Sequence, residues 1–337
     1  MIASKILLNK NILITGGTGS FGKKFIDHIL KKYNPSKLIV FSRDEQKHFE
    51  MSQSYPEDKY KNIRYFIGDV RDQNRMIRAC ANVDIIIHAA AMKHVSLSEY
   101  NPTECISTNI QGAENIIEAA IKNNVKKVIA LSTDKAANPI NLYGATKLCS
   151  DKLFVAANNL AGKHNTRFSV VRYGNVIRSK GSVIPHYEKI LDSGETKLPL
   201  TDINMTRFII SLEEGVNFVL LALSEMSGGE IFVPKLPSIK ILDLITAMAG
   251  ENNYKIVGIR PGEKLHEVMI PMEESLNCID MKSYYIIQPM FSWWNTNKLK
   301  ATILKNGKPV SKTFEYSSIN NKDWLNIKKI KQLLKLK

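Results

Sequence analysis

The stretch Asn11-Ile-Leu-Ile-Thr-Gly-Gly-Thr-Gly-Ser-Phe-Gly22 decides the fold of this chain. Its first five residues form a short apolar run, which is typical of a buried strand. Glycines then follow in the spacing G-x-x-G-x-x-G, and apolar residues recur at helical intervals from Phe21 to Leu30. A strand, a glycine turn and the N-terminus of a helix together direct backbone N–H groups at a pyrophosphate. The stretch therefore predicts the first βαβ unit of a dinucleotide-binding sheet.

The glycine turn supplies the first residues that we expect to contact a nicotinamide cofactor. Gly22 has no side chain, so the helix can pack closely against the strand. Taken without its flanking strand and helix, the motif would be weak evidence. The predicted contacts from this turn are Gly16, Thr18, Gly19, Ser20, Phe21 and Gly22.

The end of the next predicted strand, Lys37–Phe41, bears on which dinucleotide binds. An acidic residue about 20 positions after the glycines typically holds a ribose 2′-hydroxyl, whereas a nearby Arg suits a 2′-phosphate. Asp44 and Arg43 stand here side by side. Because Arg43 with Ser42 and Lys47 would form a phosphate site, we expect NADP, with NAD as the alternative. All four residues are predicted cofactor contacts.

Further elements extend the same pattern. Strands are expected at 63–67 and 83–87, and Glu104–Asn124 has the apolar spacing of a long amphipathic helix. Alternating strands and helices predict an α/β fold with a doubly wound parallel Rossmann sheet. Two strand ends in this part add the cofactor contacts Asp69, Val70 and Ala89.

The composition is that of an ordinary globular protein. Of the 337 residues, 44% are hydrophobic and 23% are charged. No apolar run reaches the roughly 18 residues that a membrane-spanning helix needs, and the N-terminus lacks the pattern of a secretion signal. The four Cys are scattered singly, which argues against a disulfide framework or a zinc site. We therefore expect a cytoplasmic protein without a membrane partner.

Lysine near the C-terminus accounts for much of the net charge of +15. The region Lys298–Lys337 has eleven Lys against Glu315 and Asp323. Such a region could bind nucleic acid, but it has no interleaved Arg and aromatic motif, so we interpret it as a solvated face. A non-enzymatic nucleotide-sensing or nucleic-acid-binding protein stays open as an alternative of another class.

The chemistry is concentrated in Ser132–Lys147, directly after an apolar run that predicts a buried strand. A helix is expected to begin near Asn141, a good N-cap residue. Tyr143 and Lys147 are four residues apart, so they share one face of that helix. We expect the ammonium to lower the pKa of the phenol, which would let Tyr143 take a proton from a sugar hydroxyl while a nicotinamide takes the hydride.

The glycine turn and the order of these residues resemble the extended short-chain dehydrogenase/reductase family, in which a Ser or Thr, a Tyr and a Lys act together. Thr133, Tyr143 and Lys147 match this set. A sugar-nucleotide 4-epimerase or reductase, which is our alternative function, would need nothing more. Asp134 and Lys135 depart from that pattern. They can supply the acid and the base for the elimination of water, if a dry pocket keeps the carboxyl protonated and the amine neutral.

Longer motifs make the resemblance more specific. The segments 131–147, 42–45, 68–72, 88–94, 171–176, 206–208 and 259–267 closely resemble those of the inverting UDP-N-acetylglucosamine 4,6-dehydratases that open the pseudaminic acid pathway. The resemblance covers almost the whole chain and is to the short branch that lacks a membrane anchor. One departure is Arg178, where relatives tend to have small residues.

This resemblance implies a role for each residue. Tyr143, aided by Lys147, would take the proton of the 4-hydroxyl, Lys135 the proton on carbon 5, and Asp134 would protonate the departing 6-hydroxyl. The product would be an L-configured 4-keto-6-deoxy sugar nucleotide. By the same resemblance, UDP-N-acetylglucosamine would contact Lys93, Thr133, Asn175, Arg207, Arg260 and Glu263.

The domain organisation and assembly complete the expectations. We predict an NADP-binding domain at 1–174 and a smaller C-terminal substrate-binding α/β lobe at 175–337, with some segments returning to the first domain. The resemblance implies a homo-oligomer, a hexamer built from dimers. His266-Glu267 begins like a zinc motif, but Ile270 stands where its second His would be, so no metal is expected.

Overall fold

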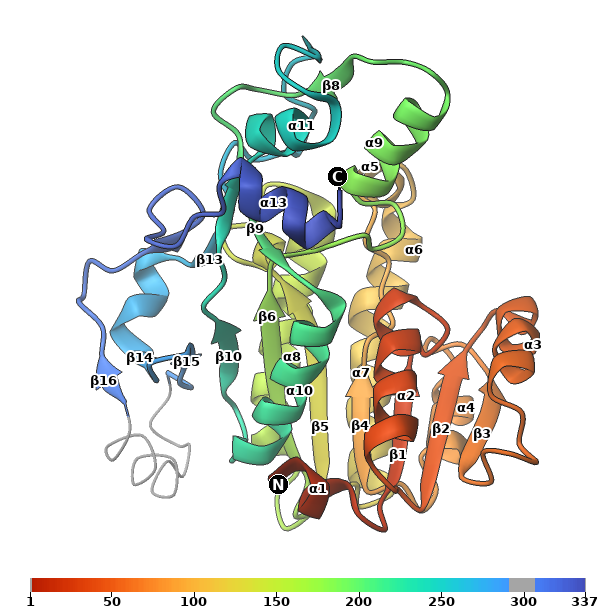
Figure 1. The fold of residues 1–337 in the computed structure, drawn as a ribbon. Helices are drawn as coiled ribbons and strands as arrows, with labels where there is room; N and C mark the ends of the chain where they lie inside the picture. The colour runs from red at the N-terminus through yellow and green to blue at the C-terminus, as the bar shows by residue number, and fades with distance from the viewer. Residues whose placement is uncertain (1, 291–306, 337) are drawn as a thin grey trace.

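The computed structural model of the protein describes residues 2–290 and 307–336. Figure 1 shows one large sheet with helices on both faces and a smaller group of elements beyond one end of its strands. The Lys-rich region falls partly outside this description, at residues 298–306 and 337. Within the described part, Lys328 and Lys329 are exposed on the helix α13 (Ile327–Leu334), in keeping with a solvated face.

Within residues 2–290 and 307–336, ten strands form the large sheet. In order across it they are β16 (Lys308–Pro309), β14 (Cys278–Asp280), β15 (Tyr284–Ile287), β10 (Ile231–Pro234), β6 (Arg167–Tyr173), β5 (Lys127–Thr133), β4 (Ile85–His88), β1 (Asn11–Thr15), β2 (Lys37–Ser42) and β3 (Ile63–Ile67). The run from β10 to β3 is parallel, and β15, β14 and β16 continue it in antiparallel pairs. The predicted doubly wound parallel sheet is confirmed.

Helices cover both faces of the parallel part. On one face α2 (Ser20–Lys32) packs against α10 (Leu212–Glu225), and on the other α7 (Gly112–Lys122) packs against α4 (Gln73–Ala79) and α8 (Leu142–Leu160). Strand residues such as Ile12, Leu13 and Ile14 are fully buried between these layers. This explains why parallel strands appear in the sequence as continuous apolar runs.

One predicted helix is interrupted. The expected helix Glu104–Asn124 is divided into α6 (Pro102–Ile106), the π-helical turn η1 (Ser107–Gln111) and α7. Within the turn, the Asn109 amide donates to the Thr146 hydroxyl on α8 (3.0 Å) and to the Met92 carbonyl (3.0 Å), and its oxygen accepts from the Met92 N–H (2.8 Å). These tertiary contacts accompany a local distortion that apolar spacing does not reveal.

A second apolar cluster lies among the elements beyond the sheet (Figure 1). It includes buried residues of α9 (Val183–Asp192), β8 (Leu198–Leu200), β9 (Thr206–Ile210), β11 (Ser238–Lys240), α11 (Ile241–Ala249) and α13. Since β10, β14 and β15 follow residue 175 yet belong to the large sheet, the chain crosses between the two clusters several times. The division at 174/175 stays a prediction.

The remaining elements are short. They are α1 (Ile2–Leu7), α3 (Glu45–Ser54), α5 (Val95–Tyr100), the 3₁₀ turns η2 (Asp134–Ala136) and η3 (Met272–Asn277), and the strands β7 (Asn175–Val176), β12 (Tyr254–Ile256), β13 (Val268–Ile270) and β17 (Tyr316–Ser317). Among the residues that the structure describes, no helix combines the length and the apolar character that crossing a membrane requires.

Candidate active site

The glycine turn brings the N-terminus of α2 against the end of β1. A Cβ atom at Gly22 would lie only 2.3 Å from the carbonyl oxygen of Gly17, so no other residue permits this approach. Gly16 has a left-handed backbone (φ +63°), and the Gly19 N–H donates back to its carbonyl oxygen (2.9 Å). A helix N-terminus exposed at such a turn fits the pyrophosphate of a dinucleotide.

The other predicted residues of the turn make local contacts. The Thr18 hydroxyl lies 3.0 Å from that of Ser42 at the end of β2. The hydroxyl of Ser20 accepts from the N–H of Lys180 (3.2 Å), which joins the turn to the loop after β7, and Phe21 stacks on Phe25.

The ends of β2 and β3 distinguish Arg43 from Asp44. The Asp44 carboxylate caps α3 by accepting from the Lys47 N–H (3.0 Å), and it also pairs with the Lys47 ammonium, so both of its oxygens are engaged. In contrast, the Arg43 side chain is 62% exposed and makes one long contact, 3.9 Å, with Asp69. Asp69 is itself held by Arg71 (2.7 Å). The guanidinium of Arg43 is therefore the more accessible ligand for a ribose substituent.

Two further predicted cofactor residues, Val70 and Ala89, follow the strands β3 and β4. Val70 is buried, its carbonyl accepts from the Asn115 amide (2.9 Å), and its side chain packs against Gly112. The N–H of Ala89, after β4, donates to the Thr15 hydroxyl (3.2 Å).

The reaction stretch folds as a strand, a 3₁₀ turn and a helix. Thr133 ends β5, Asp134 and Lys135 lie in η2, and Asn141 caps α8 by accepting from the Gly144 N–H (2.7 Å). A Cβ atom at Gly144 would lie 2.2 Å from the Lys135 carbonyl oxygen, so a glycine is needed for α8 to pack on η2. This packing brings Tyr143 to the same site as the acid–base pair.

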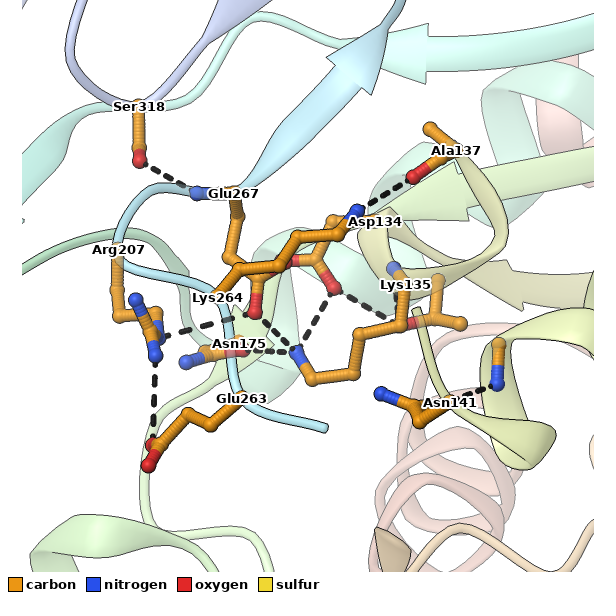
Figure 2. Close-up of polar contacts among 12 residues, drawn as sticks. Asp134, Lys135, Ala137, Asn141, Asn175, Arg207, Glu263, Lys264, Glu267 and Ser318 are labelled. Carbon is orange, nitrogen blue, oxygen red and sulfur yellow. Dashed lines mark hydrogen bonds and ion pairs between the residues drawn. The ribbon is translucent and has the colours of Figure 1, made fainter. Parts of the chain in front are cut away.

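Three oxygens surround the ammonium of Lys135 (Figure 2). Its Nζ lies 3.1 Å from Asp134 Oδ1, 3.0 Å from Glu267 Oε1 and 3.3 Å from Asn175 Oδ1. The Thr133 hydroxyl donates to the same Asp134 oxygen (2.9 Å). Asp134 and Glu267 are both buried, with 0% and 2% of their side chains exposed.

These neighbours set the charge states of the pair. Burial raises the pKa of the Asp134 carboxyl above its usual range, because the effect of desolvation exceeds that of Lys135. Burial alone would lower the pKa of Lys135, but the carboxylates of Asp134 and Glu267 more than offset it and raise that pKa above its ordinary value. The expected neutral amine is therefore wrong for the protein without its ligands, since the expectation did not include Glu267.

Tyr143 also differs from expectation. Its side chain is buried, and burial raises the pKa of its phenol to about 12, although Lys135 and the Thr133 hydroxyl act in the opposite direction. Burial lowers the pKa of Lys147, which interacts with Asp151. The predicted lowering of the phenol's pKa by Lys147 is thus wrong for the protein alone, because desolvation dominates.

Of the residues predicted to bind substrate, Arg207 and Glu263 lie beside the acid–base cluster. The buried Arg207 guanidinium contacts Glu263 Oε1 (3.4 Å) and Glu267 Oε1 (3.7 Å) and donates to the Leu265 carbonyl (3.0 Å). With Asn175 it lines a small, largely apolar cavity. Arg260 is exposed, in the loop just before Glu263.

Lys93 contacts the loop that follows β7, and Arg178 belongs to that loop. Lys93 donates to the Lys180 carbonyl (2.7 Å), which holds it against the loop after β7. In that loop Arg178 has a left-handed backbone (φ +52°) and pairs with Glu188 (2.9 Å), so its side chain is directed to α9.

Sequence reasoning missed Glu267 and Lys264 as members of the cluster. Lys264 donates to the Ala137 carbonyl (2.7 Å) and approaches the cluster from the same segment (Figure 2). Both belong to the quoted segment 259–267, so the signal was present in the sequence. Only the folded chain places that segment against η2.

Comparisons with known proteins agree with this geometry. The chain is 54% identical over 327 residues to the UDP-N-acetylglucosamine 4,6-dehydratase (inverting) of Campylobacter jejuni, with 96% of this chain and 97% of that protein covered. It is 40% identical over 336 residues to a UDP-glucose 4-epimerase of Rickettsia massiliae, with 98% and 96% covered. The X-ray structure of Pen from Bacillus thuringiensis superposes with a TM-score of 0.86 at 36% identity, covering 97% of this chain and 98% of that one.

A protein-family model also matches most of the chain. The family model described as "Polysaccharide biosynthesis protein" matches residues 12–289, which include the glycine turn, the reaction stretch and the segment of Glu267. The resemblance to inverting dehydratases drawn from the motifs is confirmed by the identity to the Campylobacter enzyme. The chain belongs to the polysaccharide biosynthesis protein family.

Proposed function

We propose that the protein catalyses the NADP-dependent 4,6-dehydration of UDP-N-acetylglucosamine with inversion at carbon 5. The product is UDP-2-acetamido-2,6-dideoxy-β-L-arabino-hex-4-ulose. The observation that carries this proposal is the position of Asp134 and Lys135, an acid and a base in contact beside Tyr143 at the end of β5. The likeness to the Campylobacter dehydratase supports it.

The residues divide the work as follows. Tyr143 accepts the proton of the 4-hydroxyl, with Thr133 and Lys147 supporting the phenolate. The glycine turn and Arg43 would hold the oxidised nicotinamide dinucleotide, which would supply the acceptance of hydride from carbon 4 and its return at carbon 6. The ketone at carbon 4 acidifies the proton on carbon 5, which Lys135 removes.

Asp134 is suited to protonate the departing 6-hydroxyl. Its Oδ1 contacts Thr133 and Lys135, whereas its Oδ2 is buried and has no hydrogen-bond partner among the described residues. A buried polar oxygen without a partner is costly, so a hydroxyl of the substrate would satisfy it. Burial raises the pKa of this carboxyl, which makes it a better acceptor for the proton that it later donates to the 6-hydroxyl.

Arg43 supports NADP over NAD. Its exposed guanidinium is free to bind a 2′-phosphate, whereas the Asp44 carboxylate is engaged by Lys47 and is a poor partner for a ribose 2′-hydroxyl.

Substrate binding and biological setting follow the same resemblance. Arg207 and Arg260 would hold the diphosphate, Glu263 the ribose, and Lys93, Asn175 and Thr133 the sugar. The geometry adds that Arg207 is already oriented by Glu263. We place the enzyme in the cytoplasm, as a homo-oligomer at the first step of pseudaminic acid biosynthesis.

One assay tests the reaction. The protein is incubated with UDP-N-acetylglucosamine and NADP in heavy water, and the product is examined by NMR. A 4-keto-6-deoxy sugar with deuterium at carbon 5 and the L configuration is expected. A product that keeps its 6-hydroxyl would contradict the proposal.

A 4-epimerase is the second candidate, because the Rickettsia relative carries that name. An epimerase needs Tyr143 and the cofactor but leaves carbon 5 untouched. The same assay separates the two functions, since epimerisation changes carbon 4 without incorporating deuterium at carbon 5.

A further inference from the structure

The contacts of Lys135 match the requirements of an ammonium. An ammonium has three N–H donors, and three acceptors lie around this nitrogen, one each from Asp134, Glu267 and Asn175. They come from three separate segments: η2, the residue preceding β13, and β7. A neutral amine has only two donors, so loss of one proton frees a lone pair on the nitrogen.

Glu267 is held through both its backbone and its side chain. Its backbone N–H donates to the Ser318 hydroxyl (2.9 Å), and its carbonyl accepts from the Ser318 N–H (2.8 Å). Its carboxylate lies between the Lys135 ammonium (3.0 Å) and the Arg207 guanidinium (3.7 Å), and the side chain is 2% exposed. Figure 2 shows this carboxylate directed toward Lys135 and Arg207.

We propose that Glu267 is a positioning residue for the chemistry at carbon 5: it fixes the Lys135 nitrogen beside Asp134 and stabilises the single proton that the two side chains share. This inference rests on the proposed dehydration. In the step, the Asp134 carboxylate gains the proton that Lys135 Nζ loses. One N–H bond breaks, one O–H bond forms, and the electron pair stays on nitrogen.

This transfer produces both reactive groups at once. Lys135 becomes the base for the carbon 5 proton, and Asp134 becomes the acid for the 6-hydroxyl, without a proton from solvent. Two cations, Arg207 and Lys135, lower the pKa of the Glu267 carboxyl against the opposing effect of burial. Glu267 is therefore ionised in the resting site, and Arg207 keeps its positive charge beside it when Lys135 loses its proton.

The charged groups around Lys135 predict how the site responds to pH. Besides Asp134 and Glu267, it faces Arg207 on β9, Lys264 from the loop before β13, and the phenol of Tyr143 on α8. Removing the negative charge of Glu267 leaves the positive charges of Arg207 and Lys264 beside Lys135. The Asp134–Lys135 pair would then bind its shared proton less tightly. The pH range in which the pair holds one proton, and in which the enzyme is active, would therefore move to lower pH.

The variant Glu267→Gln tests this inference. Because the active pair holds one proton, both limbs of the kcat profile should shift to lower pH, by about 1–3 pH units for the loss of an adjacent charge. KM for UDP-N-acetylglucosamine should change by less than about twofold, since the proposal gives Glu267 no contact with substrate. Glu230→Gln, which alters another fully buried carboxylate, should leave the pH profile unchanged.

A second variant separates charge from shape. Glu267→Asp keeps the charge, so its profile should lie at the wild-type pH even where kcat falls because of the shorter side chain. If Glu267→Gln does not fold, Glu267→Asp still decides: a shifted profile in this variant would overturn the inference.

Exchange of the carbon 5 proton gives a readout that needs no hydride transfer. The isolated 4-keto product is incubated with each enzyme in heavy water, and the exchange rate should show the same pH shift in Glu267→Gln. A Glu267→Gln profile that superimposes on the wild type, or exchange lost at every pH, would overturn the role given to Glu267. Failure of the wild type to form any 4-keto product would instead contradict the proposed function.

Discussion

The ammonium nitrogen of Lys135 lies 3.0 Å from a carboxylate oxygen of Glu267, although the two residues come from opposite halves of the chain. Lys135 follows β5 in the parallel sheet, and Glu267 precedes the short strand β13. Two buried carboxylates therefore share one ammonium, since Asp134 contacts the same nitrogen at 3.1 Å. The two carboxylates therefore keep Lys135 protonated in the protein without its ligands.

Replacing Lys135 should reveal these carboxylates. In Lys135→Ala, Asp134 and Glu267 would be buried without the cation that stabilises them, so their pKa values in the folded protein should rise above those in the unfolded chain. A raised carboxyl pKa gives stability that is present at low pH and is lost as pH rises. We expect a loss of about 3–5 kcal/mol near pH 8 and a smaller loss near pH 5.

Thermal unfolding across this pH range measures the effect. Lys31→Ala, which removes an exposed partner of Asp27, is the control and should show no comparable trend. The variant should still bind cofactor but form no 4-keto-6-deoxy product. Equal destabilisation at both pH values would contradict the conclusion that Lys135 stabilises the negative charges of Asp134 and Glu267.

Arg43 should determine cofactor preference. Arg43→Ala removes the proposed partner of the 2′-phosphate, and hydrogen bonds to charged groups contribute about 1.5–3 kcal/mol. The affinity for NADPH should fall about tenfold or more, with little change for NADH. Fluorescence titration with the two reduced cofactors measures both. Arg78→Ala, on the exposed surface of α4, should change neither; equal losses for both cofactors in Arg43→Ala would remove Arg43 from this role.

Two glycines should respond oppositely to the same substitution. At Gly22 a Cβ atom would lie 2.3 Å from the Gly17 oxygen, so Gly22→Ala must displace α2 from β1 and weaken both stability and dinucleotide binding. At Gly215, within α10, the nearest atom is 4.0 Å away, so Gly215→Ala should stabilise the protein by roughly 0.5–1 kcal/mol. Urea unfolding and cofactor titration compare the two. A Gly22→Ala variant that binds cofactor normally would argue against the close approach.

Removing Arg172 should cost more stability than removing the exposed Arg78. It is fully buried and contacts Glu274 (2.6 Å), Asp151 (3.5 Å) and the Met269 carbonyl (2.9 Å). Arg172→Met would remove this cation from Glu274 and Asp151, of which only Asp151 keeps a second cation, Lys147, at a cost of about 3–5 kcal/mol. Urea unfolding provides the measurement, with the exposed Arg78→Met as the matched control. A loss below about 1 kcal/mol would mean that these carboxylates become protonated at little cost.

The sequence alone determined the parallel sheet, the glycine turn and the helix that carries Tyr143. These depend on local patterns: apolar runs, glycine spacing and the N-cap residue Asn141, each of which acts within a few residues. The sequence also placed Asp134 and Lys135 beside each other, because they are bonded neighbours.

Only the tertiary structure decided the charges at the site. Burial raises the pKa of Tyr143. The pKa of Lys135 depends on burial, on Asp134 and on Glu267, which the fold brings to η2 from the far half of the chain. Likewise, only the fold shows that both oxygens of the Asp44 carboxylate contact Lys47, one of them as the cap of α3. Electrostatic interactions act through space and depend on desolvation, so no spacing along the chain encodes them directly.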